Sequence, residues 1–159
     1  MMPPERAWKI LDTAEQICSA VVVSEAVERL AREITAALRD VQPLVLSVMG
    51  GSVVFTGRIL PLLRFPLELD YLHVSRYGDA TRGGTMIWKA MPSTEVAGRV
   101  VLVLDDILDE GHTLAAIRDR LLEAGAKKFY SAVLADKDIG RSKPIAADFV
   151  GLKLPDRYV

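Results

Sequence analysis

The sequence predicts an α/β fold with a mostly parallel, twisted sheet flanked by helices. Residues 44–49 form a short apolar run, and residues 100–104 are hydrophobic on both faces, which is typical of a central strand in a parallel sheet. Stretches with helical spacing of apolar residues lie before, between and after these runs. Strands that alternate with helices form parallel βαβ units, so we expect one sheet with helices on its faces.

The composition fits a single soluble domain over residues 1–159. Half of the residues are hydrophobic, 26% are charged and the net charge is -1. Nothing in this balance indicates binding to nucleic acid or to an anionic membrane. No apolar run approaches the ~20 residues that span a bilayer, and the N-terminus lacks the features of a signal peptide. We therefore expect a cytoplasmic protein.

The first 40 residues are predicted to be helical. Pro3 and Pro4 stand where a helix can begin, and Ser24 is the predicted N-cap of a second helical stretch. The lone cysteine, Cys18, lies in this helical pattern, and we expect it to be a buried small hydrophobe. The apolar residues that recur at helical spacing are Val27, Leu30, Ala31, Ile34 and Leu38.

The remaining elements follow in order along the chain. A strand over 44–49 ends at Gly50-Gly51, and a glycine-rich polar stretch over 78–85 is predicted to be a mobile loop. A helix is expected to end near Gly125. The other expected elements are a helix over 52–63, strands over 67–77 and 85–91, the helix marked by Leu114, Ile117, Leu121 and Leu122, and strands over 129–134 and 148–154.

An acidic segment, Asp105 to Thr113, follows the central strand and leads into a helix. Free N–H groups at a helix N-terminus bind phosphate, and Gly111 allows a close backbone approach. Three nearby aspartates are costly unless a cation or hydroxyl groups bind among them. Together these features indicate a site for a phosphorylated ribose. The alternative is a solvated acidic loop, which the order strand, two acids, glycine, threonine and helix disfavours.

Residues 101–113 resemble the signature of type I phosphoribosyltransferases, which bind 5-phosphoribosyl-1-pyrophosphate (PRPP). The resemblance implies that Asp105 and Asp106 hold the ribose hydroxyls and contact Mg²⁺ indirectly. In the 6-oxopurine branch of the family, the acid at the position of Asp109 is also the general base near purine N7. The loop that would bind the 5-phosphate consists of Asp109, Glu110, Gly111, His112 and Thr113.

Other stretches resemble the hypoxanthine–guanine branch of the same family. Residues 48–52 resemble the pyrophosphate loop, with Met49, Gly50 and Gly51 as its contacts. Residues 75–79 resemble the start of a flexible loop, where Arg76 and Tyr77 lie and Arg76 assists pyrophosphate binding. Residues 148–151 and 155–159 resemble the base-binding hood. The residues that would bind the purine are Lys137 at the 6-oxo group, Tyr158 by stacking and Val159 through its main chain.

The sequence departs from the family in three places. Gly50 stands where many relatives have lysine, so Arg76, Arg82 or another arginine should assist the backbone at pyrophosphate. Glu110 replaces a threonine of the phosphate loop, and we expect its carboxylate to point away from the phosphate. Family members continue beyond the position of Val159 with a strand, a metal-binding aspartate and an arginine, so we expect that the sequence lacks this C-terminal segment.

The resemblance implies transfer of the 5-phosphoribosyl group from PRPP to hypoxanthine and/or guanine, with Mg²⁺, in a homodimer or homotetramer. A xanthine–guanine enzyme remains an alternative, whereas Lys137 and Asp109 disfavour a pyrimidine substrate. A non-catalytic sensor of PRPP or nucleotides with the same fold is a second alternative. An acyl-phosphate receiver domain is disfavoured because no separate central strand ends in a suitable aspartate.

Overall fold

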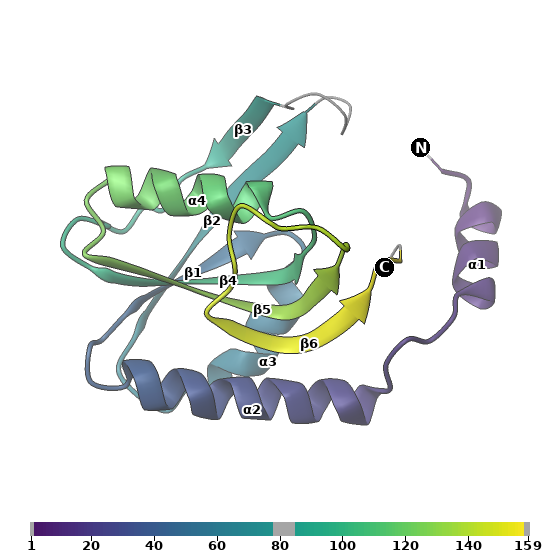
Figure 1. The fold of residues 1–159 in the computed structure, drawn as a ribbon, viewed down its shortest axis with the longest axis horizontal. Coiled ribbons are helices and arrows are strands. Elements are labelled where there is room, and N and C mark those ends of the chain that lie inside the picture. The colour runs from purple at the N-terminus through teal and green to yellow at the C-terminus, as the bar shows by residue number, and fades with distance from the viewer. Residues whose placement is uncertain (1, 78–84, 158–159) are drawn as a thin grey trace.

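The computed structural model describes residues 2–77 and 85–157, and its core is one six-stranded sheet in the order β3-β2-β1-β4-β5-β6 (Figure 1). The predicted α/β class is confirmed. The strands are β1 (Leu44–Met49), β2 (Glu68–Tyr77), β3 (Thr85–Ala90), β4 (Val100–Leu108), β5 (Lys128–Asp138) and β6 (Phe149–Pro155). The helices are α1 (Pro4–Thr13), α2 (Ala20–Leu38), α3 (Val53–Ile59), a 3-10 turn (Leu60–Leu62) and α4 (His112–Glu123).

The sheet is parallel except at one edge, where β3 runs antiparallel to β2. The parallel ladder places the carboxyl ends of β1, β4 and β5 at the same edge of the sheet. Leu108 of β4, for example, pairs with Asp136 of β5. Ligands of open parallel sheets bind beyond these ends, so this edge is where the functional site is expected.

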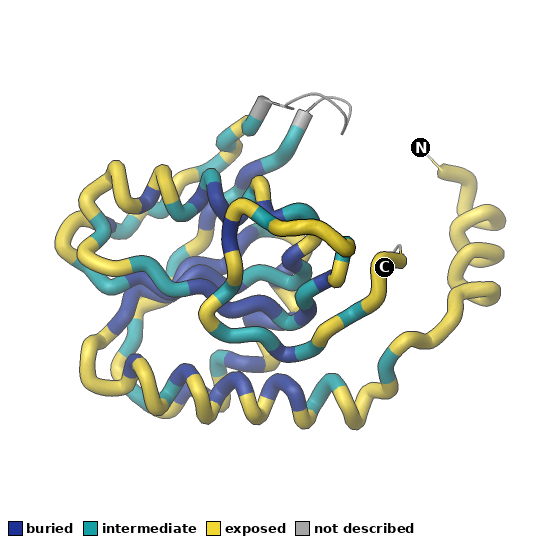
Figure 2. The backbone as a smooth tube through the Cα atoms, in the orientation of Figure 1, coloured by how far each residue is buried: buried dark blue, intermediate teal, exposed yellow. Residues whose placement is uncertain are grey.

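Helices cover both faces of the sheet, and the central strands are buried between them (Figures 1 and 2). Successive strand residues point to opposite faces, so alternate residues of β1 and β4 belong to two separate cores. The core on one face joins α2 and α3 to Val45, Leu102, Leu104 and Ala132. The core on the other face joins α4 to Leu44, Leu46, Val101, Val103 and Val133.

The N-terminal helices begin and end differently from the prediction. A non-helical stretch over residues 14–19 separates α1 from α2, and Cys18 lies in it, partly exposed. The N-cap of α2 is Ser19, whose Oγ accepts from the N–H of Val22 at 3.3 Å, and not Ser24. Ser24 lies inside the helix and donates its hydroxyl to the carbonyl of Ala20. The predictions for Ser24 and Cys18 are therefore wrong.

Two strands extend further than their apolar runs indicate. β4 continues to Leu108, so Asp105 and Asp106 lie inside the strand and not beyond its end. β5 continues to Asp138 and includes Lys137. Backbone pairing between the two strands persists as far as Leu108 and Asp136, and the last residues of β5 pair with β6, which explains the extra length. The predicted mobile loop lies, apart from Thr85 at the start of β3, outside the described residues.

The helix expected over 52–63 is in fact α3 followed by the 3-10 turn, with Ser52 just before its first residue. Among the residues that the structure describes, none of the helices is both long enough and apolar enough to cross a membrane.

The carboxylate of Asp70 in β2 fastens the segment after β3 to the sheet. It accepts from the N–H of Thr94 at 2.8 Å, from the hydroxyl of Ser93 at 3.0 Å and from the N–H of Tyr71 at 2.7 Å. Burial alone would raise its pKa, but these hydrogen bonds outweigh burial and lower the pKa of Asp70 to about 2.

We expect Asp70→Asn to lower the free energy of unfolding by about 1–2 kcal/mol at pH 7, because the three donors lose a charged acceptor. A lowered pKa stabilises the fold above the unfolded-state value of 3.8, so this loss should shrink as the pH falls from 4 to 2. Urea unfolding of both proteins at pH 7, 4 and 3 measures it, with Glu123→Gln as an exposed control. An equal difference at every pH would contradict the role of the ionised carboxylate.

Candidate active site

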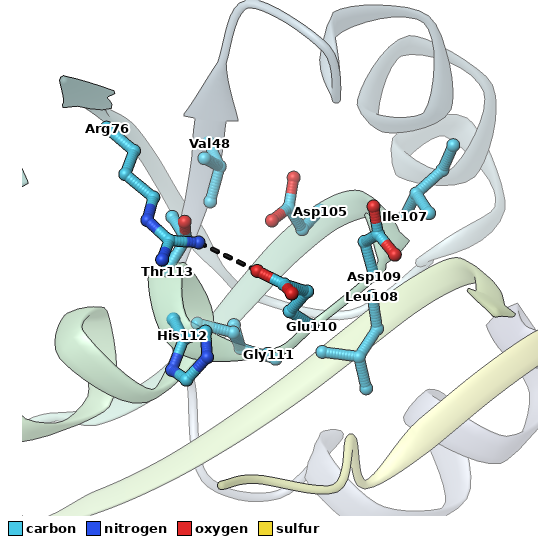
Figure 3. Close-up of a pocket in the computed structure, with 11 residues that line it drawn as sticks. Val48, Arg76, Asp105, Ile107, Leu108, Asp109, Glu110, Gly111, His112 and Thr113 are labelled. Atoms are coloured by element: carbon cyan, nitrogen blue, oxygen red, sulfur yellow. Dashed lines mark hydrogen bonds and ion pairs between the residues drawn. The ribbon is translucent and has the colours of Figure 1, made fainter. Parts of the chain in front are cut away.

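A pocket of about 290 Å³ lies where the end of β4 leads into α4, at the carboxyl edge of the sheet (Figure 3). It brings together most of the residues that the acidic segment and the flexible-loop motif predicted. The residues that line it are Val48, Arg76, Asp105, Ile107, Leu108, Asp109, Glu110, Gly111, His112, Thr113 and Leu114.

The turn over residues 109–111 connects β4 directly to α4. Gly111 has a φ of 84°, a left-handed conformation that a residue with a Cβ rarely adopts. A Cβ there would also lie 3.4 Å from Lys143, Pro144 and Ile145. The first N–H groups of a helix have no intrahelical partner, so the turn presents donors and the positive end of the helix dipole to the pocket. This geometry can bind a phosphate group.

The two adjacent aspartates of β4 face different neighbours. Asp105 lines the pocket, and burial together with the nearby negative charge of Asp106 raises the pKa of Asp105 to about 8. The carboxylate of Asp106 lies against Gly51, at the place where a Cβ of residue 51 would be. A Cβ at this position would have to displace that carboxylate, so the turn after β1 lies directly against the acid pair.

The turn between β1 and α3 is held by three buried hydroxyl groups that the sequence reading missed. Ser47 Oγ lies 2.8 Å from Ser52 Oγ and 2.9 Å from Thr56 Oγ1, and Ser52 also donates to the carbonyl of Val48 at 2.7 Å. The sequence feature that indicates this network is a set of small hydroxyl residues in an otherwise apolar strand–turn–helix stretch. This network fixes the backbone of the predicted pyrophosphate loop.

The residues of that predicted loop do not all reach the pocket. Among the described residues other than its two chain neighbours, none has an atom within 4 Å of the place where a Cβ of Gly50 would be. The peptide bond between Met49 and Gly50 is cis. Met49 lines a neighbouring hollow with Leu69 and Tyr71, while Val48 lines the pocket itself.

Glu110 forms ion pairs with two arginines, of which Arg76 also lines the pocket. Arg76 Nη1 lies 2.8 Å from Glu110 Oε2, and Arg141 Nη2 lies 2.6 Å from Glu110 Oε1. The hydrogen bond from Arg76 and the charge of Arg141 lower the pKa of Glu110. The expectation that Glu110 points away is wrong, because its carboxylate lies along the pocket wall, toward Arg76 (Figure 3).

A lysine and an aspartate meet at the start of the segment over residues 109–113, the phosphate turn. Lys137 Nζ lies 3.3 Å from Asp109 Oδ2, and the lysine is buried while the aspartate is more than half exposed. A second hollow of about 460 Å³ begins here, and Leu108 lines both it and the first pocket. The pair thus joins the two cavities.

Lys143 connects the strand ends beneath this pair, and no local pattern in the sequence indicates this role. Its Nζ donates to the carbonyl of Leu108 at 2.7 Å and to the carbonyl of Lys137 at 2.5 Å. It also pairs with Asp136 at 2.6 Å. These contacts fix the backbone next to both Asp109 and Lys137, so we assign Lys143 a positioning role.

Some predicted contacts lie outside the described residues, namely Arg82, Tyr158 and Val159. Tyr77 is the last residue of β2, and its backbone pairs with Thr85 of β3. In the part of the chain that is described, no group of three or more His, Cys, Asp or Glu side chains is arranged to hold a metal ion.

The chain is similar to phosphoribosyltransferases in sequence and in structure. The phosphoribosyl transferase domain family matches residues 14–158. The hypoxanthine-guanine phosphoribosyltransferase of Bacillus subtilis is 33% identical over 150 residues, covering 93% of this chain and 83% of that protein.

Solved structures agree with this sequence similarity. A hypoxanthine-guanine-xanthine phosphoribosyltransferase matches with a TM-score of 0.83 and 28% identity, over 92% of this chain and 85% of the other. A hypoxanthine-guanine phosphoribosyltransferase from Bacillus anthracis matches with a TM-score of 0.84 and 26% identity, over 91% and 86% of the two chains. With a phosphate turn, an acid pair and a family match over nearly its whole length, the chain belongs to the phosphoribosyltransferase family.

Proposed function

We propose that the protein transfers the 5-phosphoribosyl group from PRPP to hypoxanthine and/or guanine, giving IMP or GMP and pyrophosphate. The observation that carries this proposal is the pair of Lys137 and Asp109, 3.3 Å apart beside the phosphate turn. The 6-oxo group and N7 of a 6-oxopurine lie on one edge of the base. A lysine ammonium donates to the oxygen, and a carboxylate accepts the N7 proton, so this pair suits that edge.

The PRPP side of the site uses the residues around the first pocket. The turn over 109–113 binds the 5-phosphate, and Asp105 with Asp106 binds the ribose hydroxyls. The pyrophosphate lies by Arg76 and by the backbone of Met49, Gly50 and Gly51. Tyr158 and Val159 complete the purine site by stacking and by main-chain contacts.

Mg²⁺ fits this site if the substrate supplies most of its ligands. Magnesium in enzymes is often held by one or two carboxylates together with substrate phosphates and water. Asp105 and Asp106 are such carboxylates, and a cation nearby would favour the ionised form of Asp105, whose pKa is raised to about 8. When bound, the metal offsets the negative charge that develops on the departing pyrophosphate.

The residues of the chain then divide the reaction between them. The phosphate turn holds the ribose 5-phosphate in place, while Arg76 stabilises charge on the pyrophosphate. Lys137 orients the base through its 6-oxo oxygen, and Asp109 takes the proton from N7 as the new bond to C1 of ribose forms. Lys143 holds the backbone next to Asp109 and at Lys137 in position through its hydrogen bonds to the carbonyls of Leu108 and Lys137.

We also propose a cytoplasmic homodimer or homotetramer. An exposed apolar area on α3 and β2 suits a contact between copies, and it includes Val53, Val54, Leu69 and Tyr71. Sedimentation velocity of the purified protein tests the assembly.

A base panel tests the function. We expect pyrophosphate release and nucleotide formation from PRPP with hypoxanthine or guanine, and none with uracil, which lacks the N7 edge. Turnover of xanthine equal to that of hypoxanthine would favour the xanthine–guanine alternative. Binding of PRPP with no pyrophosphate release for any of the four bases would contradict the enzymatic proposal and favour a sensor.

A further inference from the structure

Glu110 connects three segments of the chain. It lies in the phosphate turn, while Arg76 lies on β2 and also lines the pocket, and Arg141 lies in the loop between β5 and β6 and lines the second hollow. The two arginines are 34 and 31 residues away along the sequence. Each carboxylate oxygen accepts from a different guanidinium group, so one side chain pairs with both.

A carboxylate held by two guanidinium groups resembles the way that proteins hold phosphate. Arginine binds both anions through the same planar donors. The Glu110 carboxylate therefore occupies the donors of Arg76 that a phosphate or pyrophosphate group would use. Because two anions close together repel each other, the ligand and the Glu110 carboxylate should compete for these arginines.

We propose that Glu110 is an internal anion that holds Arg76 and Arg141 in the ligand-free protein, and that the phosphate groups of the substrate displace it. The identity of the substrate as PRPP rests on the proposed function. The exchange itself concerns any pyrophosphate-bearing ligand of this pocket.

The exchange has two consequences for the site. Arg76 and Arg141 stay over the phosphate turn without a ligand, so they need little reordering when one binds. Part of the binding free energy is spent on breaking the internal ion pairs, so Glu110 lowers the affinity for the phosphate ligand and speeds its release. Glu110 is thus a positioning residue that sets affinity.

The test is isothermal titration of Glu110→Gln with inorganic pyrophosphate and with PRPP. Glutamine keeps the size of the side chain and removes its charge. We expect the Kd for each ligand to fall about fivefold, as for loss of a partly exposed ion pair. The KM for PRPP should fall in parallel while kcat does not increase. An unchanged or higher Kd would overturn the proposal.

A matched control separates the exchange from a general charge effect. Glu68→Gln makes the same change in net charge and also frees an arginine, because Glu68 pairs with Arg99 at 2.9 Å. These two residues lie at the amino end of β2 and just before β4, away from the pocket. We expect the Kd of this variant for pyrophosphate to equal that of the unmodified protein.

A double-mutant cycle tests the role of the arginines. In an Arg76→Met background, Glu110→Gln should give a smaller gain in affinity than in the unmodified protein, because one displaced donor is gone. A full gain in both the Arg76→Met and the Arg141→Met backgrounds would overturn the exchange. Thermal unfolding checks that each variant is folded, and Glu110→Asp, which keeps the charge on a shorter stem, should have an intermediate Kd.

The failure of this proposal is distinguishable from failure of the proposed function. If no base supports turnover, titration with pyrophosphate still compares Glu110→Gln with the unmodified protein. If turnover is normal but the Kd does not fall, the function stands and the exchange is wrong.

Discussion

Asp109→Asn is expected to lower kcat by about 10²- to 10⁴-fold, the range typical of loss of a general base. Asparagine keeps the shape of the side chain and an acceptor for Lys137, but it cannot take the N7 proton. The phosphate turn and the arginines remain, so the Kd for pyrophosphate should change little. Steady-state kinetics with hypoxanthine and titration with pyrophosphate measure the two effects separately.

The control for this variant is Asp119→Asn on α4. It makes the same chemical change in an exposed carboxylate that pairs with Arg118 at 2.8 Å. We expect its kcat and KM to match those of the unmodified protein. Normal turnover by Asp109→Asn would assign the proton transfer to another group and leave Asp109 as a partner of Lys137 only.

The central strands were predictable because they are apolar on both faces. β1 and the first half of β4 contribute to both cores, and such burial leaves a continuous hydrophobic run in the sequence. The second half of β4 was missed because it contains two aspartates, although Asp105, Ile107 and Leu108 still pair with β5 through their backbone. Polar residues at the end of a strand thus conceal the length of the strand.

The turn between β4 and α4 was predictable for a related reason. Its geometry depends on neighbours in sequence, from Asp109 to the first turn of α4, so a local pattern is enough. The contacts of Glu110 with Arg76 and Arg141 depend instead on which distant segments meet at the sheet edge. No local pattern states these pairings, and the prediction that Glu110 points away was wrong for this reason.

The boundary between α1 and α2 shows why the first residue of a helix is hard to predict from sequence. Ser24 and Ser19 are both good N-caps by residue type, and the apolar spacing begins clearly only after Ser24. The helix begins at Ala20 because its first turn needs no buried face, as the exposure of Val21 and Val22 shows. Burial patterns therefore locate the packed part of a helix better than its first residue.

Asp105→Asn is expected to stabilise the ligand-free protein and to weaken PRPP binding at least about tenfold. Burial and the charge of Asp106 raise the pKa of Asp105 to about 8, so its ionised form disfavours the fold. A carboxyl group with a raised pKa keeps its proton in the folded state and loses it in the unfolded state above 3.8. Its contribution to stability therefore falls as the pH rises from about 4 to 8.

Asparagine is neutral at every pH, so it removes this decline. The free energy of unfolding of the variant should exceed that of the unmodified protein by on the order of 5 kcal/mol at pH 8, and the difference should grow between pH 4 and 8 and then level off. Urea unfolding at a series of pH values measures it. Asp119→Asn is again the control, because it makes the same chemical change in an exposed carboxylate.

Weaker PRPP binding by Asp105→Asn should be accompanied by a change in proton release. Ribose hydroxyls and a cation favour ionised Asp105, so PRPP should bind with release of a proton at pH 7. Titration calorimetry in two buffers of different ionisation enthalpy counts that proton, and Asp105→Asn should release less. If Asp105→Asn is more stable but binds PRPP more weakly, then Asp105 serves substrate binding at a cost in stability. A loss of stability in Asp105→Asn would mean that its carboxyl group is part of what holds β4 in place.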